Sequence, residues 1–332
     1  WIATQRAIPM AMPPCSWKRP NRLERGKRSM LHINRVRWAL RKVSLPVGRK
    51  GLVLDVGAGG NPYPRSDVLL DRLTGAEHRC GESMMIDRPV VFGDAARRLP
   101  FKDKAFDFVI ASHILEHMAE PAAFLDELQR VGKAGYIETP NVLFERLHPY
   151  HIHCLEVLEQ DGVLHLHKKK GPVEDAFLGT KNLLADDAPL GRFMFESPEM
   201  FHVRYFWKDR IRYKVDNPEV SAEWIEEINA RSGLGEVKDS YIADETGWRD
   251  WGLALLNRWH VYRRAARLRH FDLRSILACP ACGGALNSVP QRLHCGGCGA
   301  AYAYTDGVPD FTHDLSGQEA HLPQARSIGA SA

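Results

Sequence analysis

Four of the seven cysteines fall in one short window near the C-terminus, as two C-x-x-C pairs. Cys279 and Cys282 form the first pair, Cys295 and Cys298 form the second, and twelve residues separate them. This spacing places two thiolates on each of two knuckles, the arrangement that holds a tetrahedral zinc ion. Because such a site has no open position, we expect a structural zinc and not a catalytic one. Two disulfides are the alternative, which would require an oxidising compartment.

A glycine-rich turn follows an apolar run near residue 53. Gly57, Gly59 and Gly60 would let the backbone approach a ligand closely. In open α/β sheets, ligands bind beyond the carboxyl ends of the strands. Pro62 stands where a dinucleotide fingerprint needs its third glycine, and the Gly-Lys-Ser/Thr of a P-loop is absent. S-adenosylmethionine is the third cofactor class that such a turn can serve.

Three acids suit that cofactor. Asp71 ends a second predicted strand, and a carboxylate there can accept two hydrogen bonds from a vicinal diol. Asp55 can face an ammonium group, and Asp94 can accept from an adenine amino group. The alternatives are local: a helix-capping role for Asp55 and a turn-forming role for Asp94.

Candidate proton carriers follow the fourth and fifth predicted strands. They are His113, Glu116, His117 and Glu138. An oxygen or nitrogen acceptor can require removal of a proton, which His or a carboxylate does best near neutral pH. His117 comes one helical turn after His113, so we expect the two to share a helix face. The alternative for His117 is that it packs against or caps a helix.

A second group of histidines lies between residues 148 and 167. It comprises His148, His151, His153, His165 and His167. Their spacing matches no standard zinc signature, so we favour a substrate-facing hairpin over a metal site. We expect His153 to reach the acceptor pocket.

These residues need a sheet to position them, and the pattern predicts one. Apolar runs alternate with helical spacing from residue 51 onward, which is typical of a mostly parallel α/β sheet. We expect strands at 51–56, 67–73, 90–94, 106–111, 135–139 and 163–168, a hairpin at 202–207 and 211–215, and helices at 120–131, 222–230 and 248–271. Only nine residues separate Gly57 from Asp67, whereas a parallel crossover normally takes a dozen or more. The first crossover helix is therefore expected to be absent or reduced to a turn.

Residues 51–141 resemble the class I methyltransferase superfamily. The resemblance rests on Asp55-Val56-Gly57-Ala58-Gly59, Asp71, Gly93-Asp94-Ala95, Leu99-Pro100-Phe101 and the segment Ser112-His113-Ile114-Leu115-Glu116-His117. That last segment is most similar to the small-molecule branch. The resemblance implies a Rossmann-like sheet that binds S-adenosylmethionine, with the acceptor beside His113, Glu116 and His117. It implies that the cofactor contacts Asp55, Gly57, Gly59, Gly60, Asp71, Asp94, Ala95 and Ser112.

Residues 273–311 resemble another family. The segment from Ile276 to Cys282, with Tyr302 and Asp306-Gly307-Val308-Pro309, is similar to the zinc-binding activator subunit shared by tRNA, rRNA and translation-factor methyltransferases. In that family the ribbon docks on a methyltransferase and stabilises it. The resemblance implies that this ribbon docks in cis.

Composition sets the outer limits. The 332 residues are 44% hydrophobic and 26% charged, with a formal charge of +4, as in ordinary globular proteins. No apolar run approaches the roughly 18 residues that cross a bilayer. We divide the chain into an irregular basic arm (1–29), a methyltransferase domain (30–270) with an insertion at about 142–200, a Cys₄ zinc ribbon (271–313) and a flexible tail (314–332).

We therefore predict a cytoplasmic methyltransferase acting on a small molecule or glycan-type acceptor. The second hypothesis is modification of tRNA, rRNA or a translation factor. The ribbon favours it, as do a basic segment at 17–50 and an arginine-rich helix with Arg258, Arg263, Arg264, Arg267 and Arg269. The third is a non-catalytic scaffold with a cofactor fold, which the short first crossover favours.

Overall fold

The computed structural model describes residues 45–72, 87–172, 189–232 and 248–317, together with Trp38, Leu40 and Lys42. The expected basic arm (1–29) and most of the expected tail lie outside the described residues. None of the helices in the described part is long and apolar enough to cross a membrane.

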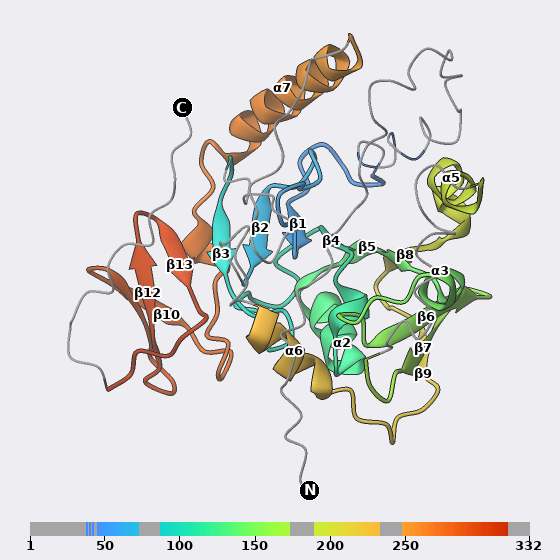
Figure 1. Ribbon diagram of the computed structural model, residues 1–332. Coiled ribbons are helices and arrows are strands. Elements are labelled where there is room, and N and C mark those ends of the chain that lie inside the picture. Colours follow the sequence, from blue (N-terminus) through green and yellow to red (C-terminus); the bar gives the residue numbers. More distant parts are fainter. Residues whose placement is uncertain are drawn as a thin grey trace, which may run out of the picture.

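A ten-stranded sheet runs through the molecule in the order β10-β11-β12-β13-β3-β2-β1-β4-β5-β8 (Figure 1). Six strands of this sheet come from the chain before the C-terminal ribbon. They are β1 (Val53–Val56), β2 (Val68–Asp71), β3 (Val90–Phe92), β4 (Phe108–Ser112), β5 (Ala134–Pro140) and β8 (His202–Lys208). Strands β1 to β5 are parallel, and β8 pairs with β5 in the antiparallel sense. The five strands expected before residue 141 are confirmed, and so is the α/β class I methyltransferase sheet.

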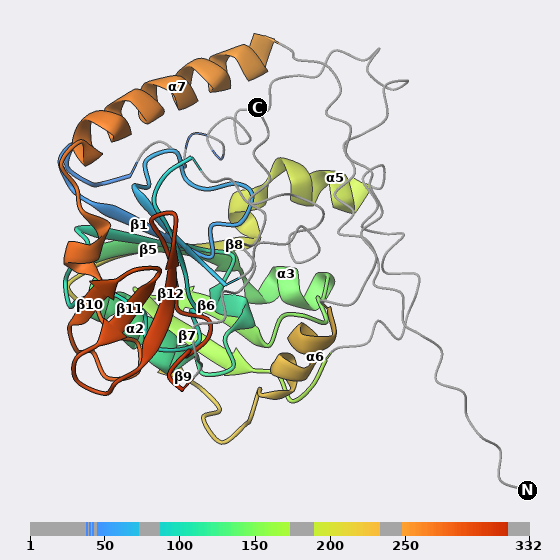
Figure 2. The same ribbon diagram turned by 90° about the vertical axis from the view of Figure 1, so that its left-hand side faces the viewer.

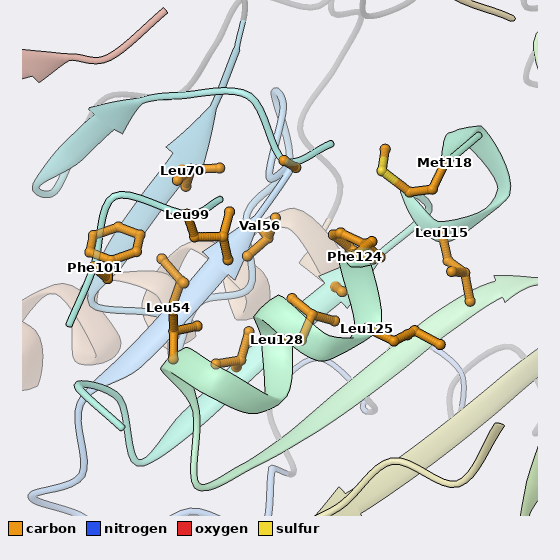
Figure 3. Close-up of a cluster of buried hydrophobic side chains, with 14 of the residues drawn as sticks. Leu54, Val56, Leu70, Leu99, Phe101, Leu115, Met118, Phe124, Leu125 and Leu128 are labelled. Atoms are coloured by element: carbon orange, nitrogen blue, oxygen red, sulfur yellow. The ribbon is translucent and has the colours of Figure 1, made fainter. Parts of the chain in front are cut away.

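Both faces of this sheet are buried, which explains the continuous apolar runs of its strands. All four residues of β1 are buried. On one face, helix α2 (Pro121–Val131) places Phe124, Leu125 and Leu128 against Leu54 and its neighbours (Figure 3). The other face holds a smaller cluster of Val53, Tyr63, Phe108, Ile110 and Tyr136. Each such side chain contributes about 1.5–3 kcal/mol of hydrophobic stabilisation, so this core positions the strand ends firmly.

The connection between β1 and β2 contains turns and no helix, as its length predicts. Pro62 and Pro64 lack the backbone N–H that a helix interior needs. Instead, the Tyr63 N–H donates to the Asp55 carboxylate over 2.8 Å, and the Asp67 N–H donates to the Val53 carbonyl. The short crossover is thus closed by hydrogen bonds back to β1.

The remaining elements of the described residues are a smaller sheet, several helices and short 3-10 turns. The three-stranded sheet contains β6 (Leu155–Gln160), β7 (Val163–Lys168) and β9 (Tyr213–Val215). The helices are α3 (Val142–Leu147), α5 (Pro189–Glu196), α6 (Trp224–Ser232) and α7 (Trp248–Leu268), with short 3-10 turns η3 (Leu115–His117), η4 (Pro198–Met200) and η5 (Leu273–Ile276). The predicted strand at 163–168 and the helices expected near 222–230 and 248–271 are present.

The hairpin expected from 202–207 and 211–215 is wrong. Strand β8 pairs along its whole length with β5, whereas β9 pairs in parallel with β7 in the other sheet. The buried face of β8, formed by Val203, Tyr205 and Trp207, is covered in the main core, so its best partner is β5 and not its neighbour in sequence. The real hairpin joins β6 to β7 through Asp161 and Gly162, whose φ angles of 52° and 72° suit a tight turn.

The C-terminal ribbon continues the main sheet beyond β3. Its strands are β10 (Leu286–Val289), β11 (Arg292–Cys295), β12 (Ala301–Thr305) and β13 (Val308–Asp310), and β13 runs parallel to β3 (Figures 1 and 2). The Phe311 N–H donates to the Phe92 carbonyl over 2.8 Å. A second contact pairs Phe101 with Leu277, flanked by the Lys102 N–H, which donates to the Ile276 carbonyl. The ribbon therefore adjoins the sheet at two separate backbone contacts.

Helix α7 is held to the sheet by buried ion pairs. Arg267 donates to the fully buried carboxylate of Asp67, with 2.5 Å between Nη2 and Oδ1. Asp67 also accepts from Arg65 over 2.8 Å. Arg264, whose side chain is 4% exposed, pairs with Asp87 over 2.6 Å. Two of the five arginines of this helix are thus bound internally.

Replacing Asp67 should loosen α7 strongly. The variant Asp67→Asn leaves the Arg65 and Arg267 guanidiniums without their shared buried counter-charge, so we expect a loss of about 3 kcal/mol in the free energy of unfolding. Asp103→Asn is the matched control, because Asp103 is 72% exposed beside Arg130 and such pairs contribute less than about 1 kcal/mol. Denaturant unfolding measures both, and equal losses would contradict the anchoring role of Asp67.

Candidate active site and zinc centre

The glycine turn after β1 packs directly against the segment after β4. Gly57 has a φ of +68°, a left-handed conformation that favours glycine. A Cβ at that position would lie 2.6 Å from the Ile114 Cδ1 atom, so the Ile114 side chain would have to shift. The backbone angle favours glycine at this position, and the neighbour adds to that preference. The turn and the segment 112–117 form two sides of the same site.

Two of the expected cofactor acids follow neighbouring strands at this edge. Asp71 ends β2, and its Oδ2 accepts from the Gly59 N–H over 3.1 Å, which ties it to the glycine turn. Asp94 follows β3, and its Oδ1 accepts from the Ala96 N–H over 3.0 Å. This hydrogen bond stabilises a turn, which is the alternative role of Asp94. Ala95, beside it, is buried.

Asp55 differs from the other two acids because it is almost completely buried. Its carboxylate accepts from the Tyr63 N–H, so it closes the short crossover. No helix begins there, and a helix-capping role is excluded by the described turn at 57–67. Burial raises the pKa of Asp55 to about 6, although the Tyr63 N–H and the charges of Lys42 and Arg88 pull it down.

His113 occupies the carboxyl end of β4 in an unusual backbone conformation. Its φ is +56°, which is uncommon for a residue other than glycine and occurs often at functional sites. Its ring lies between two carboxylates, 3.5 Å from Glu116 and 3.3 Å from Glu138. Desolvation opposes protonation of His113, but the two carboxylates outweigh it and raise its pKa to about 9. Since the side chain is 44% exposed, solvent screens part of this attraction.

Glu116 and Glu138 are both buried at the base of this site. Glu138 accepts from the Tyr136 hydroxyl over 2.5 Å and from the Ser112 hydroxyl over 3.3 Å. Glu116 accepts from the Thr139 hydroxyl over 2.8 Å. Burial alone would raise the pKa of Glu116, but His113 and the neighbouring histidines lower it to about 2. The structure thus gathers all four proton-carrier candidates, since His117 directly follows Glu116.

The expectation that His113 and His117 share a helix face is wrong. The 3-10 turn begins only at Leu115, and the left-handed backbone of His113 places its ring outside that turn. His113 lies 5.3 Å from the ring of His202, whereas His117 lies 4.8 Å from the ring of His153. Burial lowers the pKa of His117 to about 4, helped by the charge of His153.

His153 brings two further charged residues, Glu145 and Lys169, into the site. Its Nδ1 lies 2.5 Å from Glu145, whose other carboxylate oxygen accepts from Lys169 over 2.7 Å. All three side chains are at least nine-tenths buried. Glu145 is a buried residue of α3, which packs against β5 and β6. The sequence did not single out Glu145, because its burial depends on this tertiary packing.

The four ribbon cysteines converge as the spacing predicts. The sulfur atoms of Cys279 and Cys298 lie 3.7 Å apart, and those of Cys282 and Cys295 lie 3.4 Å apart. Tetrahedral zinc with Zn–S bonds of about 2.3 Å places its sulfurs about 3.8 Å apart, and a disulfide would place them at about 2.05 Å. The Gly284 and Gly297 N–H groups donate to the Cys282 and Cys295 sulfurs. The cluster therefore fits a structural zinc and excludes the disulfide alternative.

Two protein families match the chain, each over one part of it. Residues 67–137 match a methyltransferase domain, and residues 270–307 match the Trm112p-like proteins. The chain contains a methyltransferase domain and a C-terminal Trm112p-like domain. Both resemblances drawn from the sequence are thereby confirmed. No curated protein matches the chain.

Three solved structures that are similar to this chain come from archaea. A chain of the complex between the Haloferax volcanii Trm112 methyltransferase activator and a protein described as its methyltransferase partner is 17% identical, with a TM-score of 0.35; the match covers 54% of this chain and 90% of that one. The PH0226 protein from Pyrococcus horikoshii is 23% identical over 38% of this chain and 70% of that one, with a TM-score of 0.28. A SAM-dependent methyltransferase from Methanosarcina mazei is 15% identical over 35% and 69%, with a TM-score of 0.26.

Ionising the buried Asp55 carboxylate destabilises the folded state, because burial raises its pKa above the ordinary value. We therefore expect Asp55→Asn to gain stability relative to the wild type as the pH rises. The folded-state pKa of about 6 lies above the ordinary value of 3.8. The penalty of ionising Asp55 is therefore absent below about pH 4 and complete above about pH 6. We expect the stability of Asp55→Asn relative to the wild type to rise across this interval by up to roughly 3 kcal/mol. Denaturant unfolding at several pH values measures it, with the exposed Asp126→Asn as control. A flat or falling difference would contradict the burial of a charged Asp55.

The zinc centre is tested by metal content. We expect the ribbon of the reduced wild type to hold one zinc per chain, because four thiolates complete a closed site. Cys282→Ser should lose most of it and unfold the ribbon, since so small a domain depends on its metal. Cys154→Ser should retain the zinc, because Cys154 is a buried thiol outside the cluster, where burial raises its pKa to about 12. Atomic absorption on the three proteins decides, and equal zinc in all of them would refute the Cys₄ assignment.

Proposed function

We propose that this methyltransferase transfers the methyl group of S-adenosylmethionine to a small-molecule or glycan-type acceptor. The observation that carries the proposal is the meeting of two residue sets at one sheet edge. The glycine turn with Asp71 and Asp94 lies on one side, and His113, Glu116 and His117 lie on the other. Gly57 packs against Ile114 and joins the two sides.

The residues on the first side are those that would hold the cofactor. Asp71 has a carboxylate suited to the ribose hydroxyls, and its bond to the Gly59 N–H sets its position. Asp94 and Ala95 would lie beside the adenine. The methionine end would lie near the turn and the end of β4. The residues proposed for that end are Asp55, Gly57, Gly59, Gly60 and Ser112. The bound sulfonium supplies an already activated methyl group, so the protein contributes mainly orientation.

The residues on the second side differ in protonation, which gives them different roles. His113, with its raised pKa, carries a positive charge near neutral pH and can orient an electron-rich acceptor group. His117 stays neutral, and its Nδ1 donates to the Ile152 carbonyl over 2.8 Å. Its other nitrogen therefore carries a lone pair. Glu116 is anionic between them. We propose these three as the residues that face the acceptor.

We propose that the domain of residues 30–270 is stabilised in cis by the ribbon of residues 271–313. Strand β13 extends the sheet at β3, the strand that leads directly into Asp94. Leu277 pairs with Phe101, which lies in the buried core. The ribbon thus supports the adenine side of the proposed cofactor site. The solved Haloferax volcanii complex names its Trm112 protein a methyltransferase activator, and here such an activator would be part of the same chain.

RNA or a translation factor is the second candidate acceptor, and the Trm112p-like domain favours it. The arginine-rich helix supports it less than its sequence indicated, because Arg264 and Arg267 are largely buried and pair with Asp87 and Asp67 of the same chain. A non-catalytic scaffold is not favoured, since the match to a methyltransferase domain supports an enzyme. Unoxidised cysteine ligands suit a reducing compartment, so we retain the cytoplasm as the proposed location.

Cofactor binding is tested by calorimetry with S-adenosylmethionine. We expect the wild type to bind and Asp71→Ala to bind about 10–100-fold more weakly, because two charge-assisted hydrogen bonds are lost. Asp126→Ala, an exposed acid on α2, is the control and should bind like the wild type. Equal binding by Asp71→Ala would remove Asp71 from the site, and no binding by the wild type would refute the proposed cofactor.

The acceptor class is tested by incubating the protein and labelled S-adenosylmethionine with fractionated cell extract. We expect label in the small-molecule or glycan fraction. Label confined to RNA or to protein would overturn the leading proposal in favour of the second.

A further inference from the structure

Three metal-ligand side chains meet beside the end of β4, far from the ribbon in sequence. One oxygen of Glu116 and one nitrogen each of His117 and His153 all lie within 4.8 Å of one another. Glu116 is 1% exposed and His153 is 7% exposed, so bulk water does not surround the group. Glu116 and His117 come from the turn after β4, and His153 immediately precedes β6. The Cys154 N–H donates to the Glu116 carbonyl over 2.8 Å and holds the two segments together.

Hydrogen bonds at the outer nitrogens determine which ring atoms can bind a metal. The Nδ1 of His117 lies 2.8 Å from the Ile152 carbonyl, which can only accept, so this nitrogen carries the proton. The Nδ1 of His153 faces the Glu145 carboxylate, which likewise accepts. In the neutral rings, both Nε2 atoms therefore carry a lone pair. A carbonyl or carboxylate behind each imidazole is the usual support of metal-binding histidines.

The Glu145 carboxylate is itself held in place. Lys169, which is 8% exposed, donates to its second oxygen over 2.7 Å. Glu116 is oriented in the same way by the Thr139 hydroxyl. Each of the three inner side chains thus has an outer partner that sets its direction. Burying three oriented polar side chains costs free energy unless their inward-facing atoms also have an interaction partner.

We propose that Glu116, His117 and His153 bind a divalent first-row transition-metal ion. Two imidazoles and one carboxylate suit such ions, whereas Mg²⁺ and Ca²⁺ prefer oxygen ligands throughout. Three protein ligands leave coordination positions open, unlike the closed Cys₄ centre of the ribbon. The site is distinct from that centre in ligands, in position and in this openness.

The consequence for the acceptor rests on the proposed function. The metal would lie among the residues proposed to face the acceptor, so its open positions would take an acceptor oxygen. Glu116 and His117 would then act as metal ligands and not as proton carriers. His113, which contacts Glu116 from the other side, would remain available to the acceptor. The acceptor class favoured by this site is a hydroxyl-bearing molecule that can coordinate a metal.

The test is a titration with Co²⁺ of the full-length protein after dialysis to one zinc per chain, the amount that the four ribbon cysteines hold. We expect one Co²⁺ to bind per chain, with the weak visible bands of a nitrogen and oxygen site. Cobalt that replaced the ribbon zinc would instead show intense thiolate charge-transfer absorption, and zinc would appear in the dialysate. Cobalt binding only with that thiolate signature, or no binding at all, would overturn the proposal.

Variants assign the bound ion to its ligands. His117→Gln and His153→Gln should each weaken Co²⁺ binding by about 100-fold or more, and Glu145→Gln by about 10–100-fold, the range found for outer partners. His165→Gln is the matched control: it changes a histidine on the nearby β7, where His165 contacts Asp216. The control should bind like the wild type. Unchanged binding by both His117→Gln and His153→Gln would refute the site even if the wild type binds an ion.

Two further measurements separate this proposal from folding and from cofactor binding. The ribbon zinc content and the unfolding midpoint report whether a variant is folded, independently of Co²⁺. Calorimetry with S-adenosylmethionine reports the cofactor site. A protein that binds Co²⁺ at these residues but not S-adenosylmethionine would support the metal site and refute the proposed function, and the reverse result would do the opposite.

Discussion

The parallel pairing of β1 with β2 on one side and β4 on the other is the constraint on which the site depends. Strand β1 is buried along its whole length, and its backbone N–H and C=O groups have partners on both neighbours. Because all three strands point the same way, the segments that follow them must emerge at one edge. The glycine turn, Asp71 and the segment 112–117 are neighbours for this reason, although up to sixty residues of chain separate them. Two side-chain hydrogen bonds close the short first crossover. The Asp55 carboxylate in β1 accepts from the Tyr63 N–H, and the Asp67 carboxylate accepts from the Val53 N–H of β1.

Buried ion pairs in this molecule join elements that lie far apart in the sequence. Asp67 joins the crossover to α7 through Arg267. Glu145 of α3 pairs with His153, which precedes β6, and with Lys169, which follows β7. A buried ion pair of this kind adds little net stability, but removing one partner is costly, so it specifies one arrangement. The same principle operates around His113, where two buried carboxylates contact a partly exposed, positively charged ring.

The ribbon and the main sheet depend on each other through backbone pairing. An exposed edge at β3 would offer unpaired N–H and C=O groups, and β13 covers part of that edge. The ribbon in turn is small, and part of its buried surface is formed jointly with the main domain. Leu277, Cys279 and Tyr302 of the ribbon belong to the same buried cluster as Leu99 and Phe101 of the main domain.

The sequence by itself determined the parts that rest on local pattern and fixed spacing. The zinc ribbon follows from two C-x-x-C pairs, the parallel strands from fully apolar runs, and the missing first helix from nine residues that contain prolines. What only the tertiary structure decided depends on which distant surfaces meet. The partner of β8 is β5 because that pairing buries Val203, Tyr205 and Trp207, which no local turn signal could reveal. His113 and His117 face different partners because one left-handed residue precedes a short turn, and His153 reaches His117 only through the packing of β6. Hydrogen bonds and burial between segments far apart in the chain set these positions, so the spacing of residues in the sequence does not predict them.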